Sequence, residues 1–158
     1  MKARIYIETT VISYLTARPS RDIVIAGHQQ ITHDWWHICR EQFDIVASQL
    51  VMEEASAGDQ RAAQERLRIL DTIVLLEITE DALILAQELI NAEALPRQSA
   101  EDALHIAIAV TNGVEYLVTW NYRHLANATK RAKIEAVCRS VGYEPAIICT
   151  PEELLEVE

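Results

Sequence analysis

The chain has 158 residues, a formal net charge of −10 and hydrophobic residues at 50% of its positions. This length suits one globular domain with a core of its own, and we expect residues 1–158 to form a single domain. The negative charge argues against broad electrostatic binding to nucleic acids, because these are polyanions. No apolar run approaches the roughly 20 residues that span a bilayer, and the N-terminus does not resemble a signal peptide, so we expect no membrane segment.

Short apolar runs alternate with helical patterns along the whole chain. We expect strands at residues 3–7, 43–47, 73–76, 116–119 and 146–149. We expect helices at 10–16, 20–41, 49–56, 59–71, 79–94, from Ser99 through the segment ALHIAIAVTN, and at 127–141. This alternation predicts a parallel sheet covered by helices on both faces. Ligands bind such sheets at the carboxyl ends of the strands, where the strand order reverses.

Several residues mark the predicted helix ends. Thr10 is a candidate N-cap for the first helix, and Thr79 is one for the helix after the third strand. Ser99 is a further candidate, with Asp102 three residues later in capping-box-like spacing. Gly58 separates the two helices that follow the second strand. The helix after Ser99 is apolar on nearly every face, and we expect it to be buried.

Four polar residues lie where a parallel sheet would bring them to one edge. Glu8 follows the first strand, Glu54 lies on the helix after the second, Asp102 begins the buried helix, and Asn121 follows the fourth strand. Carboxylates brought together repel one another and raise each other's pKa, and a divalent metal removes this penalty. Oxygen ligands of this kind favour Mg²⁺ or Mn²⁺ over zinc.

Each of these residues also has an interpretation without a metal. Glu8 is then a solvated strand end or a charge at a helix N-terminus, and Glu54 belongs to a polar surface. Asp102 is then a helix-start residue and Asn121 a turn residue. His105, three residues after Asp102, shares its helix face, but a single histidine on an apolar helix is more often a hydrogen-bonded core residue.

Other motifs are weak or missing. His33 and His37 in HDWWH have the i, i+4 spacing of two metal ligands, but the glutamate and third ligand of an HExxH site are missing, so we favour helix packing by the tryptophans. The chain contains no GxGxxG, GxxxxGK[ST] or GxSxG motif. The three cysteines, Cys39, Cys138 and Cys149, have no CxxC spacing, which indicates reduced, mostly buried thiols of a cytoplasmic protein.

The segment 121–139 departs from the negative balance of the chain. It holds five basic residues and one acid. This segment is either a solvated helix face or a patch that contacts phosphate groups.

Four segments, in chain order, resemble the PIN domain family, and in particular the VapC-like toxins of bacterial toxin–antitoxin pairs. They are IYIETTVISYL, SQLVMEEASAGD, AEDALHIAIA and LVTWN; NYRHLANA and GYEPAIICTPEEL also resemble one VapC-related subgroup. The resemblance implies a three-layer α/β/α PIN-like fold around a parallel sheet of about five strands. It also implies a metal-dependent endoribonuclease that uses Mg²⁺ or Mn²⁺ and is the toxin of a toxin–antitoxin pair.

The acidic positions of the family fall on residues already singled out. Its first three acids fall on Glu8, Glu54 and Asp102, and its fourth acidic position falls on Asn121. Thr119 and Thr10 match hydroxyl residues of the family site. Two departures stand out, since the first acid is usually aspartate and the fourth is often aspartate.

The resemblance also suggests a role for each residue. Glu8 and Asp102 are the first choice for direct metal ligands, and Glu54 ligates directly or through water. Asn121 and Thr119 would orient water or the ligands around the metal. Arg123, Lys130 and Arg131 would hold the RNA backbone.

The implied partners are an RNA substrate, an antitoxin protein and a second copy of the chain. Three tryptophans, expected to be exposed, are candidates for the contact between copies: Trp35, Trp36 and Trp120. The alternative to an enzyme is a catalytically weakened PIN-fold module that binds RNA or protein. A phosphorylated receiver-like domain fits poorly, because Glu77 and Thr150 stand where it requires an aspartate and a lysine.

Overall fold

A five-stranded parallel sheet forms the centre of the computed structural model, which describes residues 1–155 apart from the side chain of Cys39. The strands are β1 (Arg4–Ile7), β2 (Asp44–Ser48), β3 (Val74–Leu76), β4 (Tyr116–Val118) and β5 (Ile147–Cys149). Their order in the sheet is β3-β2-β1-β4-β5, and every neighbouring pair is parallel. All five predicted strands are confirmed, with ends that differ by one residue.

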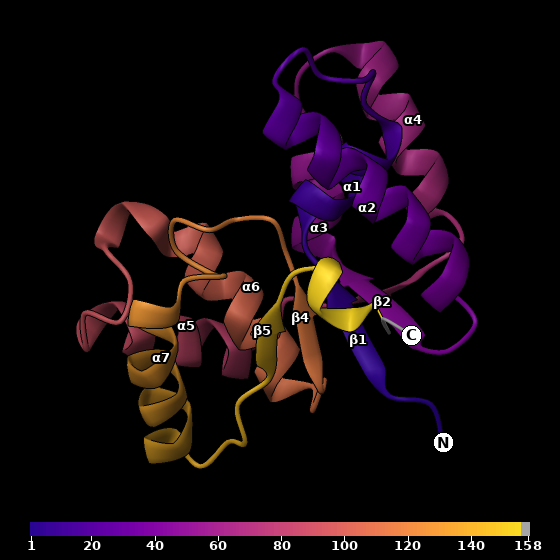
Figure 1. Cartoon of the computed structure of the whole chain (residues 1–158). Coiled ribbons are helices and arrows are strands. Elements are labelled where there is room, and N and C mark those ends of the chain that lie inside the picture. Colours follow the sequence, from indigo (N-terminus) through magenta and orange to yellow (C-terminus); the bar gives the residue numbers. More distant parts are fainter. Residues whose placement is uncertain (156–158) are drawn as a thin grey trace.

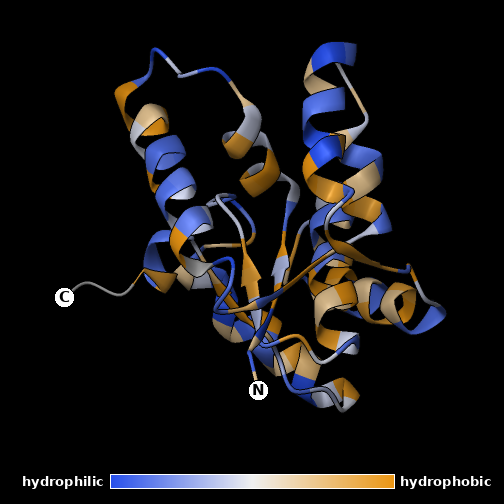
Figure 2. Ribbon diagram, turned by 90° about the vertical axis from the view of Figure 1, so that its right-hand side faces the viewer, coloured by the Kyte–Doolittle hydropathy of each residue, from blue (hydrophilic) through white to orange (hydrophobic). Residues whose placement is uncertain are grey.

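Helices cover both faces of this sheet. They are α1 (Thr9–Thr16), α2 (Ile23–Cys39), α3 (Gln49–Ala55), α4 (Gln60–Leu70), α5 (Glu80–Asn91), α6 (Ala100–Thr111) and α7 (Ala128–Val141). Two short 3₁₀ turns, Arg97–Ser99 and Glu152–Leu154, complete the chain order. Helices α5, α6 and α7 lie together on one side of the sheet and α1 to α4 on the other (Figure 1). The apolar strands therefore lie between two helical layers (Figure 1), and the helices carry both hydrophobic and hydrophilic residues (Figure 2).

The chain order explains where polar side chains can gather. From β1 the chain moves outward to β2 and β3, then returns past β1 to β4 and β5. The strand order thus reverses between β1 and β4, which are hydrogen-bonded neighbours with Ile7 opposite Val118. Residues that directly follow these two strands, such as Glu8 and Thr119, lie side by side where such sheets bind ligands.

The predicted cap at Thr10 is wrong, and the one at Ser99 is right in position but lacks the side-chain hydrogen bond. Glu8, not Thr10, caps α1, and its carboxylate accepts a hydrogen bond from the backbone N–H of Thr10. Ser99 stands at the N-cap position of α6 but makes no side-chain cap hydrogen bond. The predicted cap at Thr79 is confirmed, since its hydroxyl accepts from the N–H of Ala82 at 3.2 Å.

Two helix ends involve left-handed backbone. Gly58 separates α3 from α4 as predicted, with φ at +82°. Helix α5 ends at Asn91 rather than near Ala94, because Glu93 adopts φ +59° and turns the chain.

The tryptophans mostly belong to the core. Trp35 is fully buried and Trp120 is 4% exposed, so the expectation of exposed aromatics is wrong for both, while Trp36 is partly buried. The indole N–H of Trp120 donates to the Thr32 hydroxyl at 2.7 Å, and its ring stacks on His28. The helix-packing interpretation of HDWWH therefore holds for Trp35.

Helix α6 is buried along most of its length, as predicted. The thiols of Cys138 and Cys149 are free and buried, and the expectation for Cys39 lies outside the described side chains. Within residues 1–155, no helix has both the length and the apolar character required to cross a membrane.

Candidate active site

Glu8 is a buried carboxylate at the point where the strand order reverses. It is 5% exposed, and its Oε1 accepts hydrogen bonds from the hydroxyls of Thr10 and Thr119, both at 2.6 Å. The backbone N–H of Thr10 adds a third donor to the same oxygen at 3.2 Å. All three bonds end on Oε1, and no hydrogen bond from a described residue to Oε2 is found. These hydrogen bonds therefore hold Glu8 through one oxygen, Oε1.

The two threonines also connect the loops that follow β1 and β4. The Thr10 hydroxyl accepts from the backbone N–H of Trp120 at 2.9 Å, while the Thr119 hydroxyl accepts from the N–H of Asn121 at 3.0 Å. Because each hydroxyl oxygen already accepts a backbone N–H, its own proton is free to be donated to the carboxylate of Glu8. These bonds orient Glu8 from two strands at once.

Glu54 faces this site from α3. The Thr9 hydroxyl donates to its Oε1, and Nε2 of His105 lies 2.7 Å from the same oxygen. Burial alone would raise the pKa of Glu54, but the hydrogen bond and charge of His105, with the Thr9 bond, lower it to about 2. The neighbouring Glu101 has a raised pKa, mainly because of hydrogen bonding to and repulsion by Glu54. Of the two carboxyl groups, Glu54 therefore has the lower pKa.

His105 is fully buried in α6 and joins the site to the core. Its Nδ1 lies 2.7 Å from the hydroxyl of Tyr6, which in turn lies 2.7 Å from that of Ser48. Burial lowers the pKa of His105, but the hydrogen bond to Glu54 and the charges of nearby carboxylates raise it above its usual value. The expectation of a hydrogen-bonded core histidine is thus confirmed, with a site carboxylate as one of its partners.

These residues form a donor set that suits a divalent cation. Ligand atoms of Glu8, Glu54 and His105 lie within 4.8 Å of one another, the one such group found among the described residues. Two carboxylates suit Mg²⁺ or Mn²⁺. Four glutamates, Glu8, Glu53, Glu54 and Glu101, line an open cleft of about 500 Å³ at this point. The residues therefore fit a metal of the expected kind.

Asp102 and Asn121 form a second, adjacent cluster. The side-chain NH₂ of Asn121 donates to Oδ1 of Asp102 at 3.2 Å, and Nδ1 of His124 lies 3.0 Å from Oδ2. The side-chain carbonyl of Asn121 accepts hydrogen bonds from the backbone N–H groups of Arg123 and His124, so it shapes the turn after β4. Asp102 does not cap its helix in the predicted way. The structure brings Glu8, Glu54 and Thr119 together and leaves Asp102 and Asn121 in contact with each other beside them.

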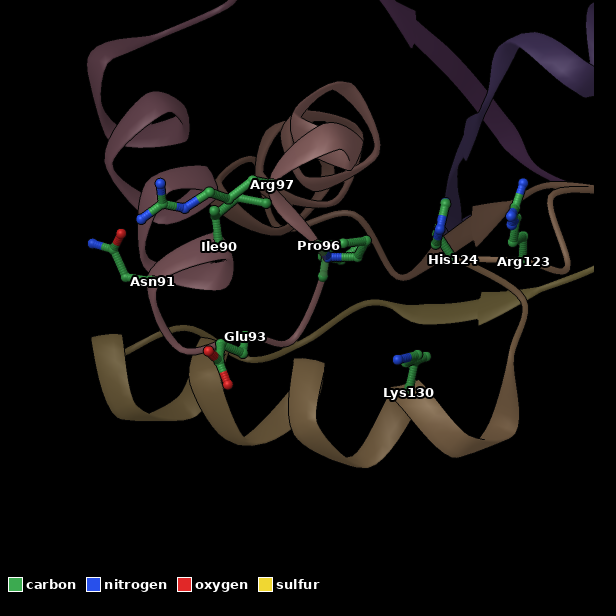
Figure 3. Close-up of a pocket in the computed structure, with 9 residues that line it drawn as sticks. Ile90, Asn91, Glu93, Pro96, Arg97, Arg123, His124 and Lys130 are labelled. Atoms are coloured by element: carbon green, nitrogen blue, oxygen red, sulfur yellow. The ribbon is translucent and has the colours of Figure 1, made fainter.

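A basic hollow of about 790 Å³ lies next to the second cluster, and we use this name for the pocket lined by Ile90, Asn91, Glu93, Leu95, Pro96, Arg97, Arg123, His124 and Lys130. Arg97 and Arg123 stand at its two ends, with His124 and Lys130 between them (Figure 3). Of the basic residues singled out in the sequence, Arg123 and Lys130 line the hollow. Arg131 instead lies 3.8 Å from Glu153.

His105 and His124 are the site residues that the sequence did not assign. His105 was recognisable only by its i+3 spacing from Asp102 on one helix face. His124 carried no local signal, because its partner Asp102 is 22 residues away in the sequence.

Comparison with known proteins shows a likeness in fold rather than in sequence. No protein-family model matches the chain, and no curated protein is significantly similar to it. Among solved structures, it is similar to VapBC2 from Rickettsia felis, bound to a DNA fragment from the promoter, with 15% identity, a TM-score of 0.59, and coverage of 93% of this chain and 98% of that chain.

Two further structures show the same likeness. Mycobacterium tuberculosis VapC20, a toxin that cleaves the sarcin–ricin loop, has 16% identity, a TM-score of 0.58, and coverage of 76% of this chain and 92% of that chain. A toxin–antitoxin complex from Klebsiella pneumoniae has 19% identity, a TM-score of 0.57, and coverage of 80% and 93%. The fold of this chain is that of the VapC toxins, which confirms the predicted three-layer α/β/α PIN-like architecture.

Proposed function

We propose that the chain is a metal-dependent endoribonuclease and the toxin of a toxin–antitoxin pair. The observation that carries this proposal is the pair Glu8 and Glu54, which meet in an open acidic cleft where the strand order reverses. Two carboxylates in one cleft repel each other unless a cation lies between them. The fold shared with a toxin that cleaves the sarcin–ricin loop supports RNA as the substrate.

Glu8 and Glu54 would hold Mg²⁺ or Mn²⁺ directly, and Asp102 would join them from the start of α6. A bound metal of this kind lowers the pKa of its water and offsets negative charge on the phosphate being cleaved. Thr10 and Thr119 keep the carboxylate of Glu8 in place through hydrogen bonds to Oε1. Asn121 does the same for Asp102, so its role is to orient a carboxylate rather than to supply a ligand oxygen.

The basic hollow would bind the backbone of the RNA. Arg123 and Lys130 line it, and Arg97 adds a third positive charge. Basic side chains fix the position of a nucleic acid by contacting its phosphates. Arg131 has a weaker claim to this role than expected from the sequence, because Glu153 lies 3.8 Å from it.

An antitoxin protein and a second copy of the chain are the partners we propose. Two of the structures with the same fold are VapBC2 and a toxin–antitoxin complex, which supports an antitoxin partner. Burial raises the pKa of Cys138 to about 11 and that of Cys149 to about 12. Both cysteines are free and buried, which supports the cytoplasmic location that we propose.

A catalytically weakened binding module is the second candidate. Two observations favour it: the first acid is glutamate, and the carbonyl oxygen of Asn121 is used within its own turn. In this case the fold would bind RNA or protein without cleaving it.

Expression and metal titration separate the two candidates. We expect the wild-type protein to arrest growth on expression and to bind Mn²⁺ in a calorimetric titration. Glu8→Gln and Asp102→Asn should each reduce the toxicity and the Mn²⁺ affinity by about tenfold or more, because each variant removes one carboxylate charge. Glu115→Gln is the matched control, since this exposed glutamate precedes β4 at the opposite end of the strand. Undiminished toxicity in both variants would overturn the metal site. A wild-type protein without Mn²⁺ binding at millimolar metal would favour the binding module.

A further inference from the structure

We propose that His105 is a positioning residue for Glu54, held in place by a buried hydrogen-bonded chain that begins at Ser48 and passes through Tyr6. The proposal rests on the metal site proposed above and adds residues that do not touch the cleft. Three contacts of 2.7 Å carry it: Ser48 Oγ to Tyr6 OH, Tyr6 OH to His105 Nδ1, and His105 Nε2 to Glu54 Oε1. The chain runs from β2 through β1 and α6 to α3.

The protons of this chain can be placed in one consistent order. The Ser48 hydroxyl accepts the backbone N–H of Val51 at 3.2 Å, which leaves its own proton to donate to Tyr6. Tyr6 then donates to Nδ1 of His105, and the remaining ring proton lies on Nε2, where it is donated to Glu54. A ring protonated on both nitrogens would reverse the bond to Tyr6 but keep the Nε2–H bond to Glu54.

The opposite tautomer does not fit the distances. With a proton on Nδ1 alone, the lone pair of Nε2 would face the carboxylate oxygen of Glu54 at 2.7 Å, and two acceptors repel at that separation. The structure therefore requires a proton between His105 and Glu54. This makes His105 a donor that orients the carboxylate rather than a ligand of the metal.

Burial indicates that the chain does more than fill space. Ser48, Tyr6 and His105 are each fully buried, and buried polar groups destabilise a fold unless every one is paired. Apolar residues of similar shape would occupy the same volume without that cost. The chain ends at the partly exposed Glu54, where a fixed carboxylate matters for metal binding. Residues that orient a metal ligand typically contribute about 10–100-fold to metal affinity.

Tyr6→Phe tests the proposal, because it removes one buried hydroxyl and leaves the ring. We expect its affinity for Mn²⁺, measured by calorimetry, to fall by about 10–100-fold, although Tyr6 is not a ligand. The matched control is Thr111→Val, which removes a hydroxyl that donates to the carbonyl of Ala107 at 2.7 Å, at the far end of α6. We expect the control to bind Mn²⁺ like the wild-type protein. Unchanged affinity in Tyr6→Phe would overturn the proposal while leaving the metal site standing.

Nitrogen NMR of the His105 ring gives a test that needs no metal binding. In the metal-free protein we expect a proton on Nε2, and a changed Nδ1 shift in Tyr6→Phe. A proton on Nδ1 alone would overturn the proposal. With Mg²⁺ added to the wild-type protein, we expect the Nε2 proton to persist, and its loss would make His105 a ligand and overturn the positioning role. A wild-type protein that binds no metal but keeps this proton would contradict only the proposed metal site.

Discussion

At the scale of single residues, Glu8 shows what the extra methylene of a glutamate can do. Its carboxylate both caps α1 through the N–H of Thr10 and reaches the Thr119 hydroxyl at the end of β4. Aspartate, the residue expected at this position from the resemblance to PIN domains, has a shorter arm. The pocket of two hydroxyls is thus shaped around a glutamate rather than around a displaced aspartate.

Glu8→Asp is therefore expected to impair the site. The carboxylate would move away from Thr119, and losing one charge-assisted hydrogen bond should lower the free energy of unfolding by about 1–3 kcal/mol. We also expect weaker Mn²⁺ binding. Urea unfolding at pH 7 and calorimetric Mn²⁺ titration measure the two effects. Stronger metal binding by Glu8→Asp would instead mean that glutamate weakens the native site.

Single residues also show where sequence reasoning stops. The acids Glu8 and Glu54 were found because each follows a strand that could be predicted locally. The role of His105 depends on Glu54, 51 residues away, and its ring tautomer depends on Tyr6, 99 residues away. A core histidine and a positioning histidine have the same local pattern, so only the folded arrangement distinguishes them. The contact of His124 with Asp102, 22 residues away, likewise becomes visible only in the folded arrangement.

At the scale of elements, the alternation of apolar strands and amphipathic helices was sufficient to predict the sheet. Parallel strands buried on both faces are continuous apolar runs, which are easy to find in a sequence. Helix starts were less certain, because the side chains of Glu8 and Ser99 take part in contacts between elements. Ser99 illustrates this, since its hydroxyl lies 3.1 Å from Nδ1 of His124 rather than on its own helix.

Helices α3 and α6 are coupled through Glu54 and His105, which predicts how stability depends on pH. Glu54 has a pKa lowered from 4.5 to about 2 in the folded protein. A carboxyl group of this kind stabilises the fold above its unfolded pKa, and the contribution is lost as pH falls from about 4.5 to about 2. His105 has the opposite effect, because its pKa is raised in the folded protein. Its protonated form stabilises the fold below pH 6.5, and this contribution is lost as pH rises through the pKa of the folded state.

Glu54→Gln should therefore flatten the acid side of the stability curve. We expect the variant to be less stable than the wild-type protein at pH 6, and to lose less stability between pH 5 and pH 2.5. Urea unfolding midpoints across this range provide the measurement. The exposed Glu115→Gln should keep the wild-type slope. An equally steep acid decline in Glu54→Gln would show that other carboxyl groups cause it.

At the scale of the whole molecule, charge separates into an acidic cleft and a basic hollow on a chain whose net charge is −10. His124 links the hollow to the cluster of Asp102 and Asn121, because it contacts Asp102 and also lines the hollow. A polyanion would be repelled by most of the surface and attracted locally, which positions its backbone beside the carboxylates. The net charge alone argued against nucleic acid, so its uneven distribution matters more than its sum.

Lys130→Ala tests whether the hollow binds RNA, since Lys130 lines it from α7. Removing one phosphate contact should weaken RNA binding at low salt and reduce the slope of log affinity against log salt by about 1. Lys133→Ala on the same helix is the matched control, because Lys133 is exposed and does not line the hollow. Both variants remove one positive charge from the molecule, so a general charge effect would change them equally. A difference confined to Lys130 would assign the contact to the hollow, and equal slopes in the two variants would place the RNA elsewhere.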